Sequence, residues 1–498
     1  MIHFPRNKLH KYPARLIAAF CALFLFLSQE YTVLADNMSA EERLEAQRAM
    51  PIASNQVPNW PAGPVVGAES AILIEAETGT ILYEKNIHQK EYPASTTKIL
   101  TALIASERCG MDEIVTFSHD AVFDTPRDSS HIAMDVGQEL TMEQCLNAIL
   151  IRSANEVCYA TAEHITGTTD WSVFADIMNE RADELGCLNS HFANPNGLPD
   201  ENHYTTAYDL AMIGRAFFAN EMLCKITLTC RMEFPATDKL PQGKLEVNLM
   251  KIIPGGEYAY EYLVGCKTGY TEDARSCLVS CAEKNGMKLI CVVMKDESPY
   301  QYEDTISLFN YGFSNFEKIF VSQTDTKYNV DNGELFYSGN DIFGNSKPFL
   351  SLNKDDFIVL PRTASFENTE SVISYDTEGK DEAALITYSY HGIPIGSIRV
   401  DFAVDKNDTF LFDTLPESPA ISQEEQTEET SFIFINVLRI LLVPAGIAAI
   451  AFLVLLVRAI LKNYAFAGRN NRRAWRRNRR RRRRRSRWNG SHNYRDYD

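Results

Sequence analysis

The sequence predicts an α+β fold in which early and late strands form one antiparallel sheet around a helical middle. Three observations predict it. A hairpin pattern lies at 71–85, helical patterns fill 99–220, and three strand patterns follow one another between 262 and 294. At 498 residues, the chain also has room for at least one further domain.

The early hairpin has apolar stretches at 71–76 and 80–85 around the turn residues Glu77-Thr78-Gly79. Pro93 then precedes apolar residues at helical spacing, which places Ser95 at the start of a helix. Each of the next three helices begins at a threonine or aspartate that can cap it. These helices are expected at 141–150, 170–185 and 206–220, then strands at 262–267, 276–282 and 288–294, and a helix at 300–316. Together the elements define one α+β domain over 67–317.

The pattern changes after the expected helix at 300–316, because helical periodicity ends there. We expect a small all-β domain over 318–412, with strands at 357–360, 371–375, 385–390 and 395–402. Residues 413–431 are rich in Glu, Ser, Pro and Gln and poor in apolar residues, which predicts a disordered acidic linker.

A membrane helix is predicted at 432–461, because 440–457 is a run of 18 residues without a charge. The tail at 462–498 is rich in arginine, and such tails stay on the cytoplasmic side. The expected location is therefore the cell membrane, crossed once, with the domain at 67–317 outside and the C-terminus in the cytoplasm.

Residues 1–35 have the pattern of an export signal. Lys8, Lys11 and Arg15 precede an apolar run at 16–27, and Val33-Leu34-Ala35 offers a cleavage site before Asp36. An uncleaved signal-anchor is the alternative. The lead-in at 36–66 is polar and contains prolines, so we expect it to be loosely ordered.

Composition and charge exclude some partners. The chain is 45% hydrophobic, 11% aromatic and 23% charged, as in globular proteins. Residues 469–487 hold 13 arginines and no acid, so with a net charge of −17 for the whole chain the remainder carries −30. An acidic body argues against nucleic acid as a partner, and the arginine run suits anionic lipid.

Eleven cysteines are present, and none shows metal-ligand spacing, since Cys277 and Cys281 lack a second pair. We expect neither a metal nor another cofactor. Cys266 and Cys277 fall on neighbouring predicted strands and could form a disulfide; small buried thiols are the alternative.

Three short motifs indicate the chemistry. They are Ser95-Thr96-Thr97-Lys98, Ser153-Ala154-Asn155 and Lys267-Thr268-Gly269, with 58 and 114 residues between their leading positions. Each is weak alone: Ser351-Leu352-Asn353-Lys354 matches the first two patterns at once, but it follows the third motif. The ordered trio is the signature of penicillin-binding proteins and serine β-lactamases.

The first two motifs can supply a nucleophile and its base. On a helix, Ser95 and Lys98 share one face. A serine hydroxyl needs a base to take its proton, and a neutral lysine can serve. Ser153, expected where a helix ends in a loop, can pass a proton to a leaving amine, and Asn155 can hold a substrate carbonyl or fix the lysine.

The third motif can bind the substrate. Lys267 and Thr268, at the expected end of a strand, can grip a carboxylate. Gly269 lets a ligand lie against the backbone, and the N–H of Tyr270 is a candidate partner for the N–H of Ser95 in binding an oxyanion. Residues 270–273 are expected to form a turn.

From about residue 55 to 412 the chain resembles the serine-type D-Ala-D-Ala carboxypeptidases, the low-molecular-mass penicillin-binding proteins. Besides the trio, the segments 194–199, 202–206 and 265–271 are similar to that family. The resemblance implies a β-lactamase/transpeptidase-like catalytic domain, acylation of Ser95 with Lys98 as base, proton relay by Ser153 and Asn155, and a carboxylate site at Lys267 and Thr268. It implies the peptidoglycan stem pentapeptide as substrate and β-lactam antibiotics as inhibitors.

Two other functions are open at this point. A class A β-lactamase requires a Glu-x-x-x-Asn element, and Glu184 to Asn189 is one residue too long for it. A membrane-bound penicillin sensor would be acylated without turnover, although the predicted cytoplasmic tail lacks the pattern of a folded domain.

Overall fold

The computed structural model describes residues 38–402, except 235, 237–241, 326, 329–349 and 377–381. These residues belong to one compact unit, 1–409. The predicted export signal, acidic linker, membrane helix and arginine-rich tail lie outside the described residues. Within the described chain, no helix combines the length and the apolar character that a membrane crossing requires.

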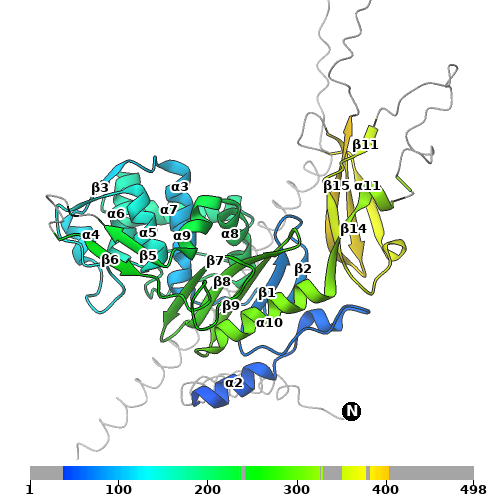
Figure 1. The fold of residues 1–498 in the computed structure, drawn as a ribbon, viewed down its shortest axis with the longest axis horizontal. Coiled ribbons are helices and arrows are strands. Elements are labelled where there is room, and N and C mark those ends of the chain that lie inside the picture. Colours follow the sequence, from blue (N-terminus) through cyan, green and yellow to red (C-terminus); the bar gives the residue numbers. More distant parts are fainter. Residues whose placement is uncertain are drawn as a thin grey trace, which may run out of the picture. The chain divides into compact units, whose positions relative to one another are not determined.

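One antiparallel sheet of five strands forms the centre of the catalytic domain, as the sequence predicts (Figure 1). Its order is β2-β1-β9-β8-β7, so the early hairpin pairs with the last strand of the late group. The strands are β1 (Ser70–Glu75), β2 (Ile81–Lys85), β7 (Leu263–Thr271), β8 (Arg275–Lys284) and β9 (Met287–Asp296). Strand β7 is an edge strand, and it carries the third motif.

Helices cover both faces of the sheet, so nearly every residue of β1 and β9 is buried. On one face, Leu308 and Phe309 of α10 (Tyr300–Asn315) pack in a core with Leu73 and Leu289. The other face packs against α8 (Ala207–Ala219) and α9 (Glu221–Leu228).

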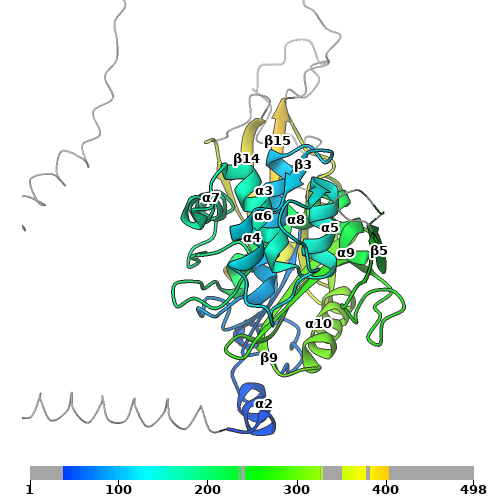
Figure 2. The same cartoon turned by 90° about the vertical axis from the view of Figure 1, so that its left-hand side faces the viewer.

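A helical subdomain extends from this second face (Figure 2). The first two motifs lie within it. It comprises α3 (Lys98–Arg108), α4 (His119–Phe123), α5 (Met142–Ile151), α6 (Asn155–Thr166) and α7 (Trp171–Glu184), with the strand pairs β3–β4 (Ile114–Thr116, Glu139–Thr141) and β5–β6 (Arg231–Phe234, Lys244–Val247). The predicted caps are confirmed: Thr141 forms a capping box with Gln144, and Asp170 and Thr206 cap α7 and α8.

The prediction of a loosely ordered lead-in is wrong from residue 38 onward. A helix, α2 (Ala40–Arg48), begins at a capping box between Ser39 and Glu42, and a short 3-10 helix, η1 (Ala53–Gln56), follows. The buried ammonium of Lys85 donates hydrogen bonds to the carbonyls of Gln47, Val66 and Ala68 at 2.8, 2.9 and 2.6 Å. One side chain thus ties the lead-in to the sheet.

The last part of the described chain is an all-β region with two small antiparallel sheets. One pairs β10 (Phe316–Phe320) with β12 (Phe357–Pro361); the other has the order β11-β15-β14-β13, from Leu350–Leu352, Ile393–Phe402, Glu382–Tyr390 and Glu370–Ser374. The short helices α11 (Val321–Thr324) and η4 (Phe366–Asn368) complete it. The four predicted strands are confirmed to within three residues at their ends, and the predicted domain boundary at 317/318 falls inside β10. Trp60 of the lead-in packs against Phe316 and Tyr390, with ring centroids 5.1 and 6.4 Å away.

Candidate active site

Ser95 lies in a tight 3-10 turn, η2 (Ala94–Thr97), and the α-helix begins only at Lys98. Ala94 has a positive φ of 49°, and Thr96 Oγ1 donates to the Pro93 carbonyl at 2.7 Å. Gly197, with φ +80°, supports the turn from outside, because a Cβ there would lie 1.8 Å from the Ala94 oxygen. The turn therefore holds Ser95 directly before the helix that begins with Lys98.

The Lys98 amine is fully buried and lies between three acceptors. It donates to Ser95 Oγ at 2.9 Å, to Asn155 Oδ1 at 2.7 Å and to the Asn196 carbonyl at 2.6 Å. Burial lowers its pKa to about 8, because the charged form loses its hydration, although Cys158 and Glu156 oppose the shift. A neutral amine, the form that can accept the serine proton, is thus accessible near neutral pH.

The second motif brings Ser153 and Asn155 to the same place. Ser153 has φ +59° and lies in the connection between α5 and α6, as the sequence predicts. Asn155 does not lie in this connection; it is the first residue of helix α6. The backbone N–H of Asn155 donates to the Ser130 carbonyl at 2.9 Å. The start of α6 therefore fixes the amide that contacts Lys98.

Lys267 approaches from the edge strand β7. Its buried ammonium donates to Ser153 Oγ at 3.2 Å and to the Thr268 carbonyl at 2.8 Å. Burial, followed by the nearby charge of Lys98, lowers its pKa to about 7. All three motifs are thus linked by hydrogen bonds, from Ser95 through Lys98 to Asn155 and from Lys267 to Ser153.

The sequence predicts that the strand ends at the third motif, and this prediction is wrong, because β7 continues to Thr271. Thr268 is half-buried, and Tyr270 is 57% exposed. Gly269 meets the nucleophile turn: a Cβ there would lie 2.8 Å from the Pro93 oxygen and 2.9 Å from the Ser95 nitrogen. Only a residue without a side chain lets strand and turn approach so closely.

Sequence reasoning did not assign individual roles to the residues that support the nucleophile turn. His203 Nε2 lies 2.8 Å from Thr97 Oγ1, and its Nδ1 accepts from the Ala193 N–H at 3.1 Å. Burial lowers the pKa of His203 to about 4, so the ring is neutral. Thr101 Oγ1 donates to the Pro195 carbonyl at 2.6 Å. The sequence did point to this region, because Pro195 and His203 fall in 194–199 and 202–206, two of the segments that resemble the family.

The element that a class A β-lactamase needs is not assembled from Glu184 and Asn189. Glu184 forms an ion pair with Arg181 at 2.8 Å at the exposed end of α7. The N–H of Asn189 donates to the buried carboxylate of Asp209. Both residues are therefore engaged elsewhere.

All ten cysteines in the described part of the chain are free, which excludes the bridge considered for Cys266 and Cys277. Across the sheet, Cys266 faces Ser280 and Cys277 faces Gly269.

One group of side chains outside the three motifs brings potential metal-ligand atoms within 4.8 Å of one another; it consists of Cys109, Glu113 and His164.

Comparison with known proteins agrees with this geometry. The model of the D-alanyl-D-alanine carboxypeptidase family, peptidase family S11, matches residues 57–298. The carboxypeptidase DacF of Bacillus subtilis is 34% identical over 258 residues, which cover 50% of this chain and 63% of the relative. DacB2 of Mycobacterium tuberculosis is 30% identical over 260 residues, which cover 51% of this chain and 84% of the relative.

Solved structures support the fold. Penicillin-binding protein 5 of Haemophilus influenzae has a TM-score of 0.53 at 23% identity, covering 69% of this chain and 98% of that chain. Penicillin-binding protein 6B of Escherichia coli has a TM-score of 0.51 at 23% identity, with the same coverage. With the ordered motifs in hydrogen-bond contact and a relative matched over 84% of its length, the chain belongs to the D-alanyl-D-alanine carboxypeptidase family of serine peptidases.

Proposed function

We propose that this protein is a serine-type D-Ala-D-Ala carboxypeptidase that removes the terminal D-alanine from peptidoglycan stem pentapeptides through an acyl-enzyme on Ser95. One observation carries the proposal. A fully buried lysine with a lowered pKa contacts the hydroxyl of a serine held in a tight turn, beside a second buried cation on the sheet edge.

Acylation begins when the neutral amine of Lys98 accepts the proton of Ser95 Oγ. The oxygen attacks the carbonyl of the penultimate D-alanine, and the C=O electrons move to its oxygen. The N–H groups of Ser95 and Tyr270 are the proposed donors to this oxyanion. When the C–N bond breaks, Ser153 delivers a proton to the leaving amine and recovers one from Lys98.

Binding depends on the other cation. Lys267 and Thr268 receive the terminal carboxylate, whose negative charge favours the protonated form of Lys267. Asn155 positions Lys98 and can donate its amide N–H to the substrate carbonyl. Gly269 lets the peptide lie along the edge of β7.

Deacylation follows the same steps with water as the nucleophile and Lys98 as its base. The products are D-alanine and a stem one residue shorter. β-Lactam antibiotics offer a strained amide with a neighbouring carboxylate, so we propose that they acylate Ser95 as inhibitors. For location, we propose that the predicted helix at 432–461 holds the catalytic domain outside the cell membrane; the export signal and the arginine-rich tail support this.

The deciding experiment compares Ser95→Ala with Ser351→Ala, since Ser351 belongs to a matching pattern in β11. With a pentapeptide substrate, we expect wild-type and Ser351→Ala to release one alanine and to be labelled by fluorescent penicillin. Ser95→Ala should show neither. Labelling of Ser95→Ala would contradict the proposal; a cross-linked product would indicate a transpeptidase, and labelling without turnover would indicate a sensor.

A further inference from the structure

A group of potential metal ligands lies outside the active site, at the far ends of the two helices that begin with Lys98 and Asn155. Cys109 is the C-cap of α3, Glu113 directly precedes β3, and His164 lies in the last turn of α6. We refer to these three residues as the Cys-Glu-His cluster, whose ligand atoms all lie within 4.8 Å of one another. Cysteine spacing gives no sign of the cluster, because His164 follows Glu113 by 51 positions.

The packing of the helices brings the cluster together. Helices α3 and α6 run in the same direction, because their first residues, Lys98 and Asn155, share a hydrogen bond of 2.7 Å, and their last turns lead to Cys109 and His164. Cys109 is half-buried and packs against the hydrophobic core, whereas Glu113 is exposed. The thiol is therefore held in place by the fold, and the carboxylate can turn toward an ion.

The carboxylate of Glu113 is already oriented toward the other ligands. Its Oε1 accepts from the Gly110 N–H at 2.6 Å, and its Oε2 lies 2.8 Å from His164 Nε2. Hydrogen bonds from outer partners orient metal ligands in this way. In a tetrahedral zinc site, oxygen and nitrogen ligands lie about 3.4 Å apart, and sulfur and nitrogen about 3.6 Å apart. The separations in the cluster, from 2.8 Å to at most 4.8 Å, include these values, so small side-chain rotations suffice.

The surroundings of the cluster favour a cation. The C-terminal ends of α3 and α6 both meet there, and the C-terminal end of a helix carries a partial negative charge. Asp112 adds a second carboxylate: a Cβ on Gly110 would lie 3.2 Å from Asp112 Oδ1 and 3.3 Å from Glu113 Oε1. Among the described residues, Glu113 pairs with His164 and not with a lysine or arginine.

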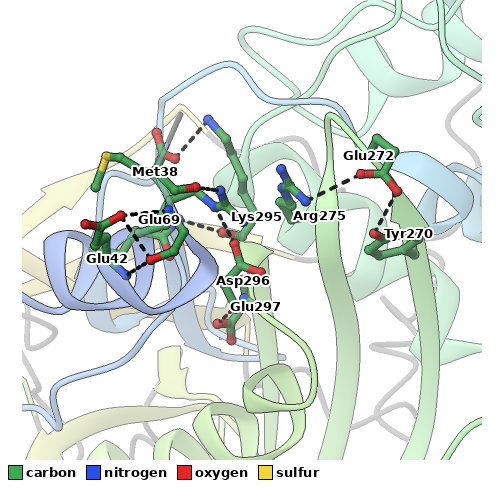
Figure 3. Close-up of polar contacts among 12 residues, drawn as sticks. Met38, Glu42, Glu69, Tyr270, Glu272, Arg275, Lys295, Asp296 and Glu297 are labelled. Carbon is green, nitrogen blue, oxygen red and sulfur yellow. Dashed lines mark hydrogen bonds and ion pairs between the residues drawn. The ribbon is translucent and has the colours of Figure 1, made fainter. Parts of the chain in front are cut away.

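A cluster of acids near α2 provides a contrast, because cations of the chain balance it. Figure 3 shows Lys295 close to Glu69 and Arg275 close to Glu272, and these ion pairs measure 2.9 and 3.5 Å. Within the described part of the chain, the Cys-Glu-His cluster is the one group in which three ligand-type side chains come together.

We propose that Cys109, Glu113 and His164 bind one Zn²⁺ ion, which holds the ends of α3 and α6 together. Thiolate, imidazole and carboxylate are zinc ligands, whereas Mg²⁺ and Ca²⁺ require oxygen ligands. Binding releases the thiol proton of Cys109 to solvent, and water takes the fourth position. Since α3 has 11 residues, Lys98 lies about 16 Å away along the helix. The ion therefore stabilises the helix ends and takes no part in the proposed acylation.

The test adds Zn²⁺ or Co²⁺ to the purified full chain after a chelator has removed bound metal. We expect the wild-type chain to bind one Zn²⁺ more than Cys109→Ser. Its Co²⁺ form should show a thiolate-to-metal charge-transfer band that Cys109→Ser lacks. His164→Ala should weaken zinc binding at this site by at least about 100-fold, because it removes a ligand. Excess Mg²⁺ should not displace the zinc.

The matched controls are Cys230→Ser and His119→Ala, which account for ions bound elsewhere on the chain. Cys230 is an exposed free cysteine, and His119 forms an ion pair with Asp120 at 3.2 Å, but neither belongs to the cluster. Both controls should keep the zinc stoichiometry and the cobalt spectrum of the wild-type chain.

A measurement on the wild-type chain covers the case in which a cluster variant does not fold. Zn²⁺ should slow alkylation of Cys109 by iodoacetamide at least about tenfold, as followed by mass spectrometry, and should leave alkylation of the exposed Cys230 unchanged. Alkylation of Cys109 at the same rate with and without Zn²⁺ would overturn the site. Equal zinc binding by the wild-type chain and a folded Cys109→Ser would also overturn it, leaving an ordinary ion pair beside a free thiol.

Discussion

Gly269→Ala tests whether the contact between β7 and the nucleophile turn controls acylation. The added Cβ would lie 2.8 Å from the Pro93 oxygen, 2.9 Å from the Ser95 nitrogen and 3.0 Å from the Thr96 nitrogen, whereas ordinary contacts begin near 3.4 Å. These neighbours are backbone atoms, so strand and turn must separate by about 0.5 Å. Since a misplacement of about 1 Å can cost 100-fold, we expect acylation to slow by about tenfold to 100-fold.

Gly265→Ala is the matched control on the same strand. Its Cβ would lie 3.0 Å from Phe218 Cε1 and from Thr227 Oγ1, which are side-chain atoms away from the nucleophile turn. We expect both variants to lose about 1–3 kcal/mol of stability. The assay is the second-order rate constant for labelling by fluorescent penicillin, with thermal melting measured in parallel. Labelling of Gly269→Ala at the wild-type rate, or an equal loss in Gly265→Ala, would refute the reasoning.

Three further predictions follow from buried groups. The pKa of Lys98 is about 8, so kcat should rise with pH through about 8 as Lys98 becomes neutral. The pKa of Lys267 is about 7, so KM should rise above about pH 7 as Lys267 loses its charge. A pH–rate profile checks both, and a midpoint near 10.5 for kcat would contradict the assignment of Lys98 as the base. Lys85→Met leaves three carbonyls without their donor and should cost about 3 kcal/mol in urea unfolding, against less than about 0.5 kcal/mol for the exposed Lys225→Met. Because the described cysteines are free, a reducing agent should leave the melting temperature unchanged; a large drop would indicate a disulfide.

Locally determined elements were the ones that the sequence predicted well. The helices α5, α7 and α8 begin at Thr141, Asp170 and Thr206, as predicted, because a cap needs only residues three or four positions apart. Helix α2 was missed, since its sequence has almost no apolar face. It is held by Lys85, a residue 37 positions after its last one, and no local pattern reports such a contact.

In the site, too, the sequence predicted local patterns and missed long-range contacts. The three motifs were found because their residue types and order are distinctive. Their support was only partly found: the Asn196 carbonyl accepts from Lys98 across 98 residues, and a backbone carbonyl leaves no signature in residue type. Ser351 shows the converse. Its pattern is a good local match, but the fold places it on β11, where Asn353 donates to Asp401 at 2.8 Å.

Helix α2 has a consequence for how this enzyme can diverge from its relatives. The family match begins at residue 57, after α2 has ended, yet Gln47 and Met50 line a cavity of about 700 Å³ together with Glu91 and Tyr92. None of the residues that line this cavity belongs to the three motifs. Substitutions in α2 can therefore change the wall of this cavity without touching the residues that carry out the proposed acylation.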